Sequence, residues 1–408
     1  MTENRRVVIT GMGAVTAIGG SLPDFWAHLL EGVCGIRPFS LFDPAAYRTQ
    51  TAAEVTEIPD AFLTPGERRR MSRADRMGVA AAREAIAASG LDLARENPAR
   101  VGVILGGGTS GLIDSEAFFA LYLRGRKGRP SKVLNHLPDS ITDRVAQRFG
   151  LEGIKSTITT ACSSSANAMG YAFDAIRAGL ADVVVTGGSD VLARLTYGGF
   201  NSLRSVDPEP CRPFDRERKG LSIGEAAGIL VFEEAGRARR RGAPIVAEFR
   251  GYGVTSDAYH MTAPDPWGAA GGRTIRAALE NAGVNAEEVD YVNAHGTATP
   301  QNDSAETAAL KAGLGGRARE IPISSIKSMI GHCLCASGAI EAVATALTVR
   351  DGKVPPTIHY ENPDPACDLD YVPNTARDMP VDVALSNSFA FGGNSSVVVL
   401  ARYDGSAP

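Results

Sequence analysis

Three segments in the first part of this chain recur, in the same order, in its second part. The first pair is a strand with a glycine-containing turn, and the second is a helix followed by a strand. The third pair is a strand, a turn and a long helix. Strands that alternate with helices are typical of mostly parallel sheets covered by helices. Two such halves packed on each other predict an α/β fold, a duplicated five-layer αβαβα sandwich. The paired segments are residues 5–19 and 244–258, 81–111 and 275–299, and 156–180 and 321–347.

The length of the chain also favours two halves. Its 408 residues are too many for one ordinary core. We expect the halves to span residues 1–245 and 246–408, because the basic segment RARRRGAP (237–244) interrupts the pattern between them. The number of residues between the two members of a pair falls from the first pair to the third, so the segments are spaced more widely in the first half than in the second. The first half is therefore expected to carry insertions around 112–150 and 190–220.

The segment after Cys162 predicts a helix. Its apolar residues recur at three- and four-residue steps and form one stripe, which is more typical of a helix that faces a core than of a cofactor pocket. Gly179 lies in the last expected turn. The stripe consists of Ala166, Met169, Phe173, Ile176 and Leu180.

The composition excludes several classes of function. Lys and Arg number 42 against 46 Asp and Glu, so the net charge of −4 does not indicate a nucleic-acid-binding surface. No apolar run approaches the roughly 20 residues that a membrane span needs. A strand-like segment begins at Val7 and leaves no room for a signal peptide. We expect a cytoplasmic protein that binds neither nucleic acid nor membrane.

Six cysteines in a chain of this length do not indicate a disulfide framework. Cys333 and Cys335 stand beside His332, but this spacing lacks the paired C-x₂₋₄-C pattern of a zinc site. Buried small thiols are the simpler interpretation, and no metal is predicted. The cysteines are at positions 34, 162, 211, 333, 335 and 367.

Four motifs with reactive side chains or a glycine turn each follow a short apolar or β-branched run. This pattern predicts four strands whose ends lie close together. One thiol, two imidazoles and one ammonium group at such a place indicate thiolate chemistry on an acyl group. The clusters are TTACSSSANA around Cys162, NAHGTATP around His295, SSIKSMIGH with Lys327 and His332, and NSFAFGGNSS with Gly392 and Gly393.

Each of these residues also has a structural interpretation. Cys162 is expected at the first turn of a helix, where the helix dipole lowers a thiol pKa, but a lone cysteine is often buried and inert. His295 is either a group in a cleft or a strand-terminal histidine bonded to backbone. Lys327 is either in the site or a surface lysine. The duplication favours the site, because it places Lys327 and His332 where the first half places Cys162.

The four motifs, in this order, closely resemble those of the beta-ketoacyl-acyl-carrier-protein synthases, the Cys-His-His condensing enzymes of the thiolase superfamily. The resemblance runs from VVITGMGAVTAIG to FGGNSSVVVLAR, which is essentially the whole chain. It implies a thiolase-like fold and a decarboxylating Claisen condensation, in which an acyl thioester gains two carbons from a malonyl carrier protein. It implies no diffusible cofactor, because the phosphopantetheine arm arrives with the carrier protein.

The resemblance also implies roles for individual residues. Cys162 would take the acyl chain as a thioester, and His295 and His332 would stabilise the enolate oxygen formed on decarboxylation. Lys327 would orient the site, and the amides of Cys162 and Phe391 would hold the thioester oxygen. Two threonines would bind the phosphopantetheine arm, and two glycines would form a gating loop. The implied substrate-binding residues are Thr297, Thr299, Thr109, Phe200, Gly392 and Gly393.

Carrier proteins are acidic, so their docking surface is expected to be basic. Two basic clusters and one further arginine fit such a surface, although a solvated charged face is the alternative for any single residue. The expected docking residues are Arg68, Arg69, Arg70, Arg124, Arg126, Lys127 and Arg204.

Three further segments favour one branch of the family. QNDSAETAA (301–309), FDPAAYRTQTAAE (42–54) and DPACDLDYVP (364–373) are similar to ketosynthase subunits of type II polyketide systems. Thr109 stands where fatty-acid elongating enzymes usually carry an aliphatic residue. A fatty-acid elongating synthase remains the alternative, ahead of a thiolase, a cysteine hydrolase or a non-catalytic chain-length-factor subunit without the cysteine. The expected assembly is a homodimer or a heterodimer with a chain-length-factor-like paralogue.

Overall fold

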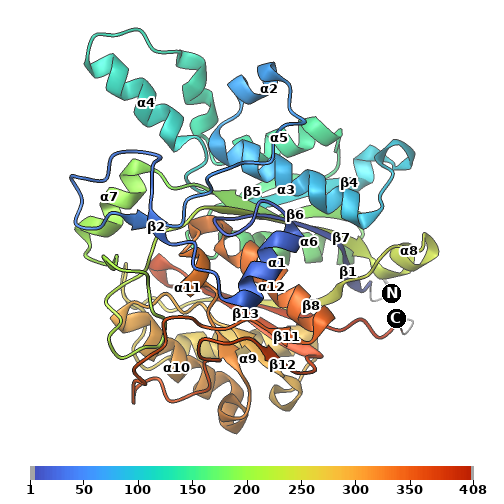
Figure 1. The fold of residues 1–408 in the computed structure, drawn as a ribbon. Helices are drawn as coiled ribbons and strands as arrows, with labels where there is room; N and C mark the ends of the chain where they lie inside the picture. Colours follow the sequence, from blue (N-terminus) through green and yellow to red (C-terminus); the bar gives the residue numbers. More distant parts are fainter. Residues whose placement is uncertain (1–4, 406–408) are drawn as a thin grey trace.

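Ten strands form one mixed sheet in the order β10-β9-β13-β14-β8-β1-β7-β6-β4-β5. The structure is a computed structural model and describes residues 5–405 (Figure 1). The strands of the first half are β1 (Val7–Val15), β4 (Val101–Gly106), β5 (Lys155–Ile158), β6 (Val183–Asp190) and β7 (Ala226–Glu234). Those of the second half are β8 (Ala247–Ser256), β9 (Tyr291–Asn293), β10 (Ile323–Ser324), β13 (Val383–Phe389) and β14 (Asn394–Ala401).

The two halves repeat one topology, which confirms the predicted duplication. Reading outward from the centre, β1, β7, β6, β4 and β5 correspond to β8, β14, β13, β9 and β10. In both halves the two outer strand pairs are parallel and the two inner pairs are antiparallel.

The expectation of mostly parallel sheets was wrong for the inner strand pairs of both halves. The last strand of each half, β7 or β14, inserts beside the first strand and runs antiparallel to both neighbours. In the second half this needs only the short turn between Phe389 and Asn394, because antiparallel strands can be joined by a tight connection.

Helices divide the molecule into the five predicted layers (Figure 1). Two helices lie between the halves and pack on strands of both, and each sheet half carries further helices on its outer face. The halves themselves join where Val7–Ile9 pairs with Ala247–Phe249. The central helices are α6 (Ser164–Arg177) and α12 (Ser337–Asp351). The outer helices are α3 (Arg73–Ser89) and α5 (Ser140–Phe149), and α9 (Ala269–Ala282) and α10 (Pro300–Leu314).

The apolar stripe after Cys162 is confirmed except at its end. Ala166, Met169, Phe173 and Ile176 are buried on α6, whereas Leu180 is 60% exposed. The helix ends at Arg177, and Gly179 has a φ of 71°, which turns the chain out of the helix. Leu180 therefore leaves the buried face.

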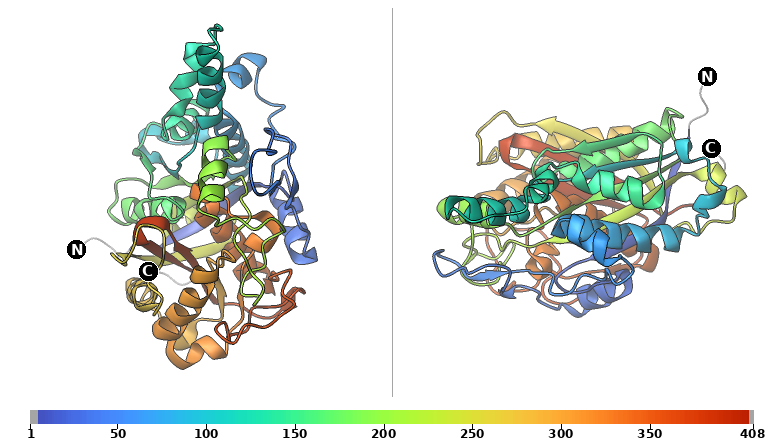
Figure 2. Two further views of the ribbon diagram at one scale, coloured as in Figure 1. Left: turned by 90° about the vertical axis from the view of Figure 1, so that its left-hand side faces the viewer. Right: turned by 90° about the horizontal axis from the view of Figure 1, so that it is seen from above.

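The segments in which insertions were expected carry elements outside the repeated plan. Helix α4 (Leu112–Leu123) and the 3-10 turn Pro130–His136 project from the body of the molecule (Figure 2). Helix α7 (Arg194–Ser202) lies beside the loop that joins β2 (Arg37–Pro38) and β3 (Thr51–Ala52). The remaining α-helices and strands of the described residues are α1 (Leu22–Glu31), α2 (Pro65–Arg70), α8 (Ala235–Arg240), α11 (Lys327–Ile330), β11 (Lys353–Val354) and β12 (Arg377–Asp378). In the described part of the chain, no helix combines the length and apolar character of a membrane span.

The start of α6 lies directly on strand β4. A Cβ atom added at Gly106 would lie 2.4 Å from the backbone nitrogen of Ser165 and 2.6 Å from its Cα. Real Cβ contacts are not this short, so only glycine at position 106 allows the helix that follows Cys162 to approach the sheet.

We predict that Gly106→Ala lowers the free energy of unfolding by about 3 kcal/mol, because the methyl group forces the backbone of α6 away from β4. Urea denaturation measures this change. Gly316→Ala is the matched control, since a Cβ there meets nothing within 4 Å and should change stability by less than about 0.5 kcal/mol. Equal stability of the two variants would contradict the tight contact.

Candidate active site

Cys162 lies in the turn between β5 and α6. Ala161 before it has a φ of 51°, which is unusual for a residue with a side chain, and Cys162 itself is 8% exposed. Burial raises the pKa of the thiol to about 11, although the Lys327 ammonium and the backbone N–H groups of Phe391 and Cys162 lower it. The sequence predicted a lowered pKa from the helix terminus alone. That prediction was wrong in direction because desolvation outweighs the favourable charges in this structure.

His332 follows α11 and faces this sulfur. Its Nε2 atom lies 3.1 Å from Cys162 Sγ, and its Nδ1 atom accepts a 3.1 Å hydrogen bond from the backbone N–H of Leu334. An atom that accepts from an amide carries no proton, so the ring proton is on Nε2. Burial and the Lys327 ammonium lower the pKa of His332 well below its usual range. The ring is therefore neutral and presents an N–H to the sulfur.

His295 follows strand β9 and is arranged in the same way. Its Nδ1 lies 3.4 Å from Lys327 Nζ, and an ammonium group can only donate, so its proton is also on Nε2. Burial, Lys327 and His332 all lower the pKa of His295. The two imidazole rings are perpendicular, at 88°, with centroids 5.3 Å apart. The site thus holds two neutral rings with their Nε2 atoms protonated.

Lys327 is 1% exposed and forms an ion pair with Glu341 of α12, which is also 1% exposed. This burial excludes the surface-lysine interpretation. Burial raises the pKa of Glu341 to about 7, while the Lys327 ammonium lowers it. Sequence reasoning missed Glu341, although one acidic residue inside the apolar run SGAIEAVATAL was a signal.

A cavity of about 290 Å³ reaches the three reactive side chains. Thr109 lies outside this lining, because its hydroxyl bonds to the buried Asp190 carboxylate and to the Val191 carbonyl. Its role in substrate binding stays a prediction. The predicted residues that line the cavity are Cys162, His295, His332, Phe200, Thr297, Thr299, Phe391, Gly392 and Gly393.

The glycine loop forms one wall of the cavity. Gly392 and Gly393 have φ angles of 78° and 76°, and a Cβ at Gly393 would lie 1.9 Å from Asp257 Oδ1. The N–H of Gly392 donates to the Met261 carbonyl at 2.8 Å. Phe391 at the start of this loop packs on Phe200 of α7, with ring centroids 5.6 Å apart.

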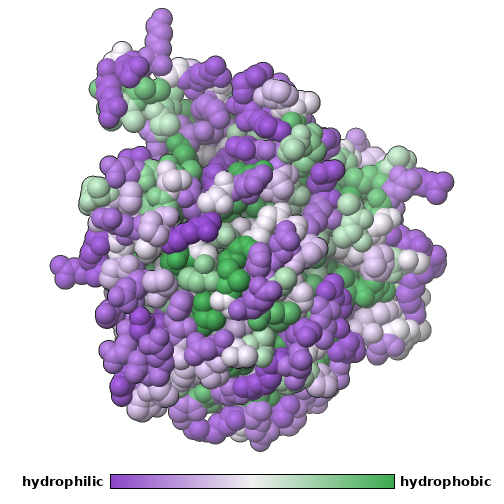
Figure 3. Space-filling model, in the orientation of Figure 1, coloured by the Kyte–Doolittle hydropathy of each residue, from purple (hydrophilic) through white to green (hydrophobic). Residues whose placement is uncertain are grey.

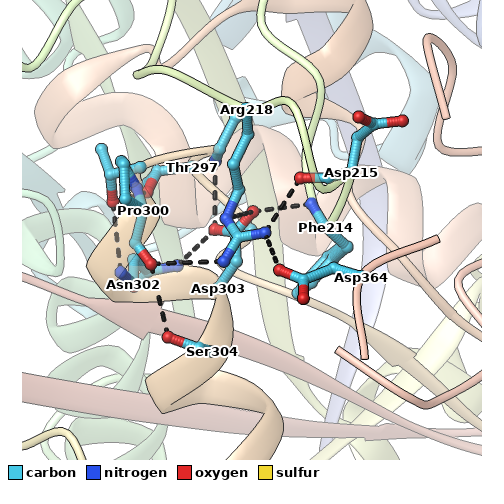
Figure 4. Close-up of polar contacts among 12 residues, drawn as sticks. Phe214, Asp215, Arg218, Thr297, Pro300, Asn302, Asp303, Ser304 and Asp364 are labelled. Atoms are coloured by element: carbon cyan, nitrogen blue, oxygen red, sulfur yellow. Dashed lines mark hydrogen bonds and ion pairs between the residues drawn. The ribbon is translucent and has the colours of Figure 1, made fainter. Parts of the chain in front are cut away.

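Thr297 and Thr299 lie on the turn before α10, which the carboxylate of Asp303 holds; Thr297 and Asp303 are labelled in Figure 4. Ala298 between them has a φ of 66°, and its N–H donates to Asp303 Oδ1 at 3.1 Å. The Arg218 side chain lies between Asp303 and Asp364 and ties this turn to neighbouring loops.

One helical turn further along α10, the Glu306 carboxylate accepts the backbone N–H groups of His295 and Gly296 at 2.8 and 2.7 Å. Sequence reasoning missed Arg218, Asp303 and Glu306. The signal available was the pair of acidic residues three positions apart at the start of a helix after the HGTATP motif.

The predicted docking residues are exposed and lie in three separate places on the molecule. Three arginines lie on α2, and Arg124, Arg126 and Lys127 follow the end of α4. Arg204 follows α7 next to Leu203, which lines the cavity. In residues 5–405, no group of three or more His, Cys, Asp or Glu side chains is placed to hold a metal ion.

Family models match both halves of the chain. The model described as "Beta-ketoacyl synthase, N-terminal domain" matches residues 4–238, and "Beta-ketoacyl synthase, C-terminal domain" matches residues 246–361. The chain is 41% identical to 3-oxoacyl-acyl-carrier-protein synthase 2 of Staphylococcus aureus (strain COL), covering 99% of this chain and 100% of the relative. It is 43% identical to the tetracenomycin polyketide synthase ketoacyl synthase alpha subunit of Streptomyces glaucescens, covering 98% and 97%.

Solved structures agree with these relatives. The ishigamide ketosynthase/chain length factor matches with a TM-score of 0.93 and 35% identity over 98% of this chain and 100% of that one. A type II PKS acyl-carrier protein in complex with its ketosynthase bound to the hexaketide matches with a TM-score of 0.91 and 32% identity over the same shares. With these matches, and with a cysteine and two histidines at one cavity and a buried lysine against one of those histidines, the chain belongs to the beta-ketoacyl synthase family of acyl-transferring condensing enzymes.

Proposed function

We propose that this condensing enzyme is the catalytic ketosynthase of a type II polyketide pathway. The resemblance of residues 42–54, 301–309 and 364–373 to such subunits supports the proposal. The 43% identity of the chain to a polyketide synthase alpha subunit supports the proposal as well. Elongation of fatty acids is the second candidate, favoured by 41% identity to a 3-oxoacyl-acyl-carrier-protein synthase 2.

The observation that carries the proposed mechanism is the pair of neutral imidazoles at Cys162. In the first half-reaction the Cys162 thiolate attacks the carbonyl carbon of an acyl thioester. The carrier's pantetheine sulfur leaves as a thiolate and takes up the proton that Cys162 had lost, and the acyl group stays on the Cys162 sulfur. The backbone N–H groups of Cys162 and Phe391 lie at this sulfur, where they can donate to the oxyanion of the tetrahedral intermediate.

In the second half-reaction a malonyl thioester loses carbon dioxide, and the electrons of the broken C–C bond form an enolate. The Nε2–H groups of His295 and His332 donate to the enolate oxygen, where negative charge develops. The enolate carbon then attacks the acyl carbon on Cys162, the C–S bond breaks, and the beta-ketoacyl chain leaves on the carrier. Thr297 and Thr299 would bind the pantetheine arm in the cavity.

The substrates arrive on an acyl carrier protein, and the basic residues on α2, after α4 and at Arg204 would receive its acidic surface. All of these side chains are exposed, as docking requires. A related ketosynthase has been solved in complex with its acyl-carrier protein. No diffusible cofactor is needed for this chemistry, and a cytoplasmic location remains our expectation.

A second subunit would cover the apolar side chains of the projecting arm and the sheet edge beside it. Strand β5 is the edge strand of the first half, and edge strands offer unpaired backbone groups to a partner. Apolar side chains are exposed on the nearby arm, where apolar colour is visible in Figure 3. In a polyketide system we propose that the partner is a chain-length-factor-like paralogue, and otherwise a second copy. The exposed residues are Phe119, Tyr122, Leu123, Leu134 and Leu137.

We predict that Cys162→Gln abolishes condensation but retains release of carbon dioxide from malonyl carrier protein, because the two imidazoles remain in place. Carbon dioxide release and beta-ketoacyl product are measured on the same folded protein. His332→Ala is the complementary variant. It should lower the rate of decarboxylation by at least about tenfold, because one hydrogen bond to the developing negative charge is lost. If Cys162→Gln loses both activities while folded, the division of roles is wrong.

We predict that the double charge reversal Arg69→Glu and Lys127→Glu raises the KM for malonyl carrier protein about tenfold and leaves the KM for malonyl-pantetheine unchanged. The added negative charges repel the acidic carrier, and the effect should shrink at high salt. Arg240→Glu is the matched control, because Arg240 is exposed on α8, and α8 lies on the opposite side of the molecule from α4 (Figure 1). Equal effects on both KM values would contradict the proposed docking surface.

We predict that the native complex contains a paralogue without the nucleophilic cysteine, and that intact-protein mass spectrometry shows acylation of Cys162. Incubation with a set of acyl carrier proteins reports which acyl group is transferred. A polyketide ketosynthase should carry a polyketide starter or intermediate and co-purify with that paralogue. A homodimer loaded only with long saturated chains would instead establish fatty-acid elongation.

A further inference from the structure

The hydroxyl of Ser337 lies against the catalytic ring of His332. Ser337 is the first residue of α12 and is 1% exposed, and its Oγ lies 2.9 Å from His332 Nδ1. Among the described residues this is the only hydrogen bond of the Ser337 side chain, so the hydroxyl is committed to the imidazole.

A helix-capping role does not account for this serine. A serine at a helix start often accepts a backbone N–H of the first turn. Helix α12 has no side-chain cap, and its N-cap residue is Ala336. The first turn is held from outside instead, because the Ala339 N–H donates to Ser165 Oγ at 2.9 Å.

The same ring nitrogen already receives one backbone donor. The Leu334 N–H reaches Nδ1 at 3.1 Å, from a residue with a φ of 53° that only a fixed turn would hold in this conformation. The next residue, Cys335, donates its N–H to the buried Asp190 carboxylate at 3.1 Å and so holds that turn. Since Nδ1 has no proton, the Ser337 hydroxyl must be the donor in its contact.

We propose that Ser337 is a positioning residue for His332, whose hydroxyl donates a second hydrogen bond to Nδ1 and keeps the proton on Nε2. Two donors at Nδ1 oppose its protonation, because a proton there would leave the Leu334 N–H without an acceptor. They also draw electron density from the ring, which makes Nε2–H a better donor to a developing oxyanion. This inference rests on the proposed role of His332 in decarboxylation.

The test compares Ser337→Ala, Ser337→Cys and Ser337→Thr in carbon dioxide release from malonyl carrier protein. Ser337→Ala should lower kcat about fivefold, the effect of one neutral hydrogen bond, with KM unchanged because Ser337 does not line the cavity. Ser337→Cys keeps the volume but is a weak donor, so it should behave like alanine. Ser337→Thr keeps the hydroxyl and should restore kcat to within about twofold.

A spectroscopic measurement separates the hydrogen bond from packing. In protein labelled with ¹⁵N-histidine, the Nδ1 resonance of His332, assigned by its loss in His332→Asn, should move downfield in Ser337→Ala and Ser337→Cys. Thr348→Val is the matched control, because it removes a buried hydroxyl of the same helix whose one hydrogen bond within residues 5–405 is to the Ala344 carbonyl. It should change neither the resonance nor kcat.

The outcomes decide between the explanations. Wild-type kcat in Ser337→Cys would mean that the serine only fills space and would overturn the proposal, as would an unshifted Nδ1 resonance in Ser337→Ala. If Ser337→Thr does not fold, the alanine and cysteine variants still decide. If the wild-type enzyme releases no carbon dioxide, the proposed function fails. The resonance measurement still tests the hydrogen bond in that case.

Discussion

The buried ammonium of Lys327 determines the chemical state of the other groups in the site. Removing a charge from water is expensive, and the Glu341 carboxylate of α12 compensates for that burial. The remaining N–H groups of Lys327 can only donate, which fixes the tautomer of His295. Burial lowers the pKa of both histidines, and the same positive charge lowers it further. At Cys162 this charge opposes the larger effect of burial, which raises the pKa of the thiol. This one charge therefore acts on both imidazole rings and on the sulfur.

The duplicated fold explains how these groups meet. Cys162, the proposed nucleophile, lies just before α6, and Lys327 and His332 lie in the equivalent region before α12. These two helices touch at their first turns, where a Cβ at Gly338 would lie 2.9 Å from the nitrogen of Ala166. Because the interior is close-packed, this contact sets the distance between Cys162 and His332. The distance between Cys162 and His332 is thus set by the central layer.

Sequence patterns predicted the layers and the reactive side chains because both are local features. A strand followed by a turn and a helix can be recognised in ten to twenty residues, and so can a motif such as NAHGTATP. The supporting groups escaped prediction because each lies on a helix that does not contain its partner, so that only the fold brings the two together. Glu341 has meaning only beside Lys327, and Glu306 only beside the backbone of His295. The direction of the Cys162 pKa shift was missed for the same reason, since burial depends on the entire fold.

The tautomers restrict how the thiol can be activated. His332 already carries a proton on the nitrogen that faces Cys162, so this ring cannot act as the base that removes the thiol proton in this arrangement. It can only donate to the sulfur, which stabilises the thiolate after the proton has left. Formation of the thiolate therefore depends on the two backbone N–H groups at the sulfur and on Lys327, which oppose the effect of burial. In the proposed mechanism, a ring fixed as a donor acts on both the sulfur and the later enolate without changing its protonation state.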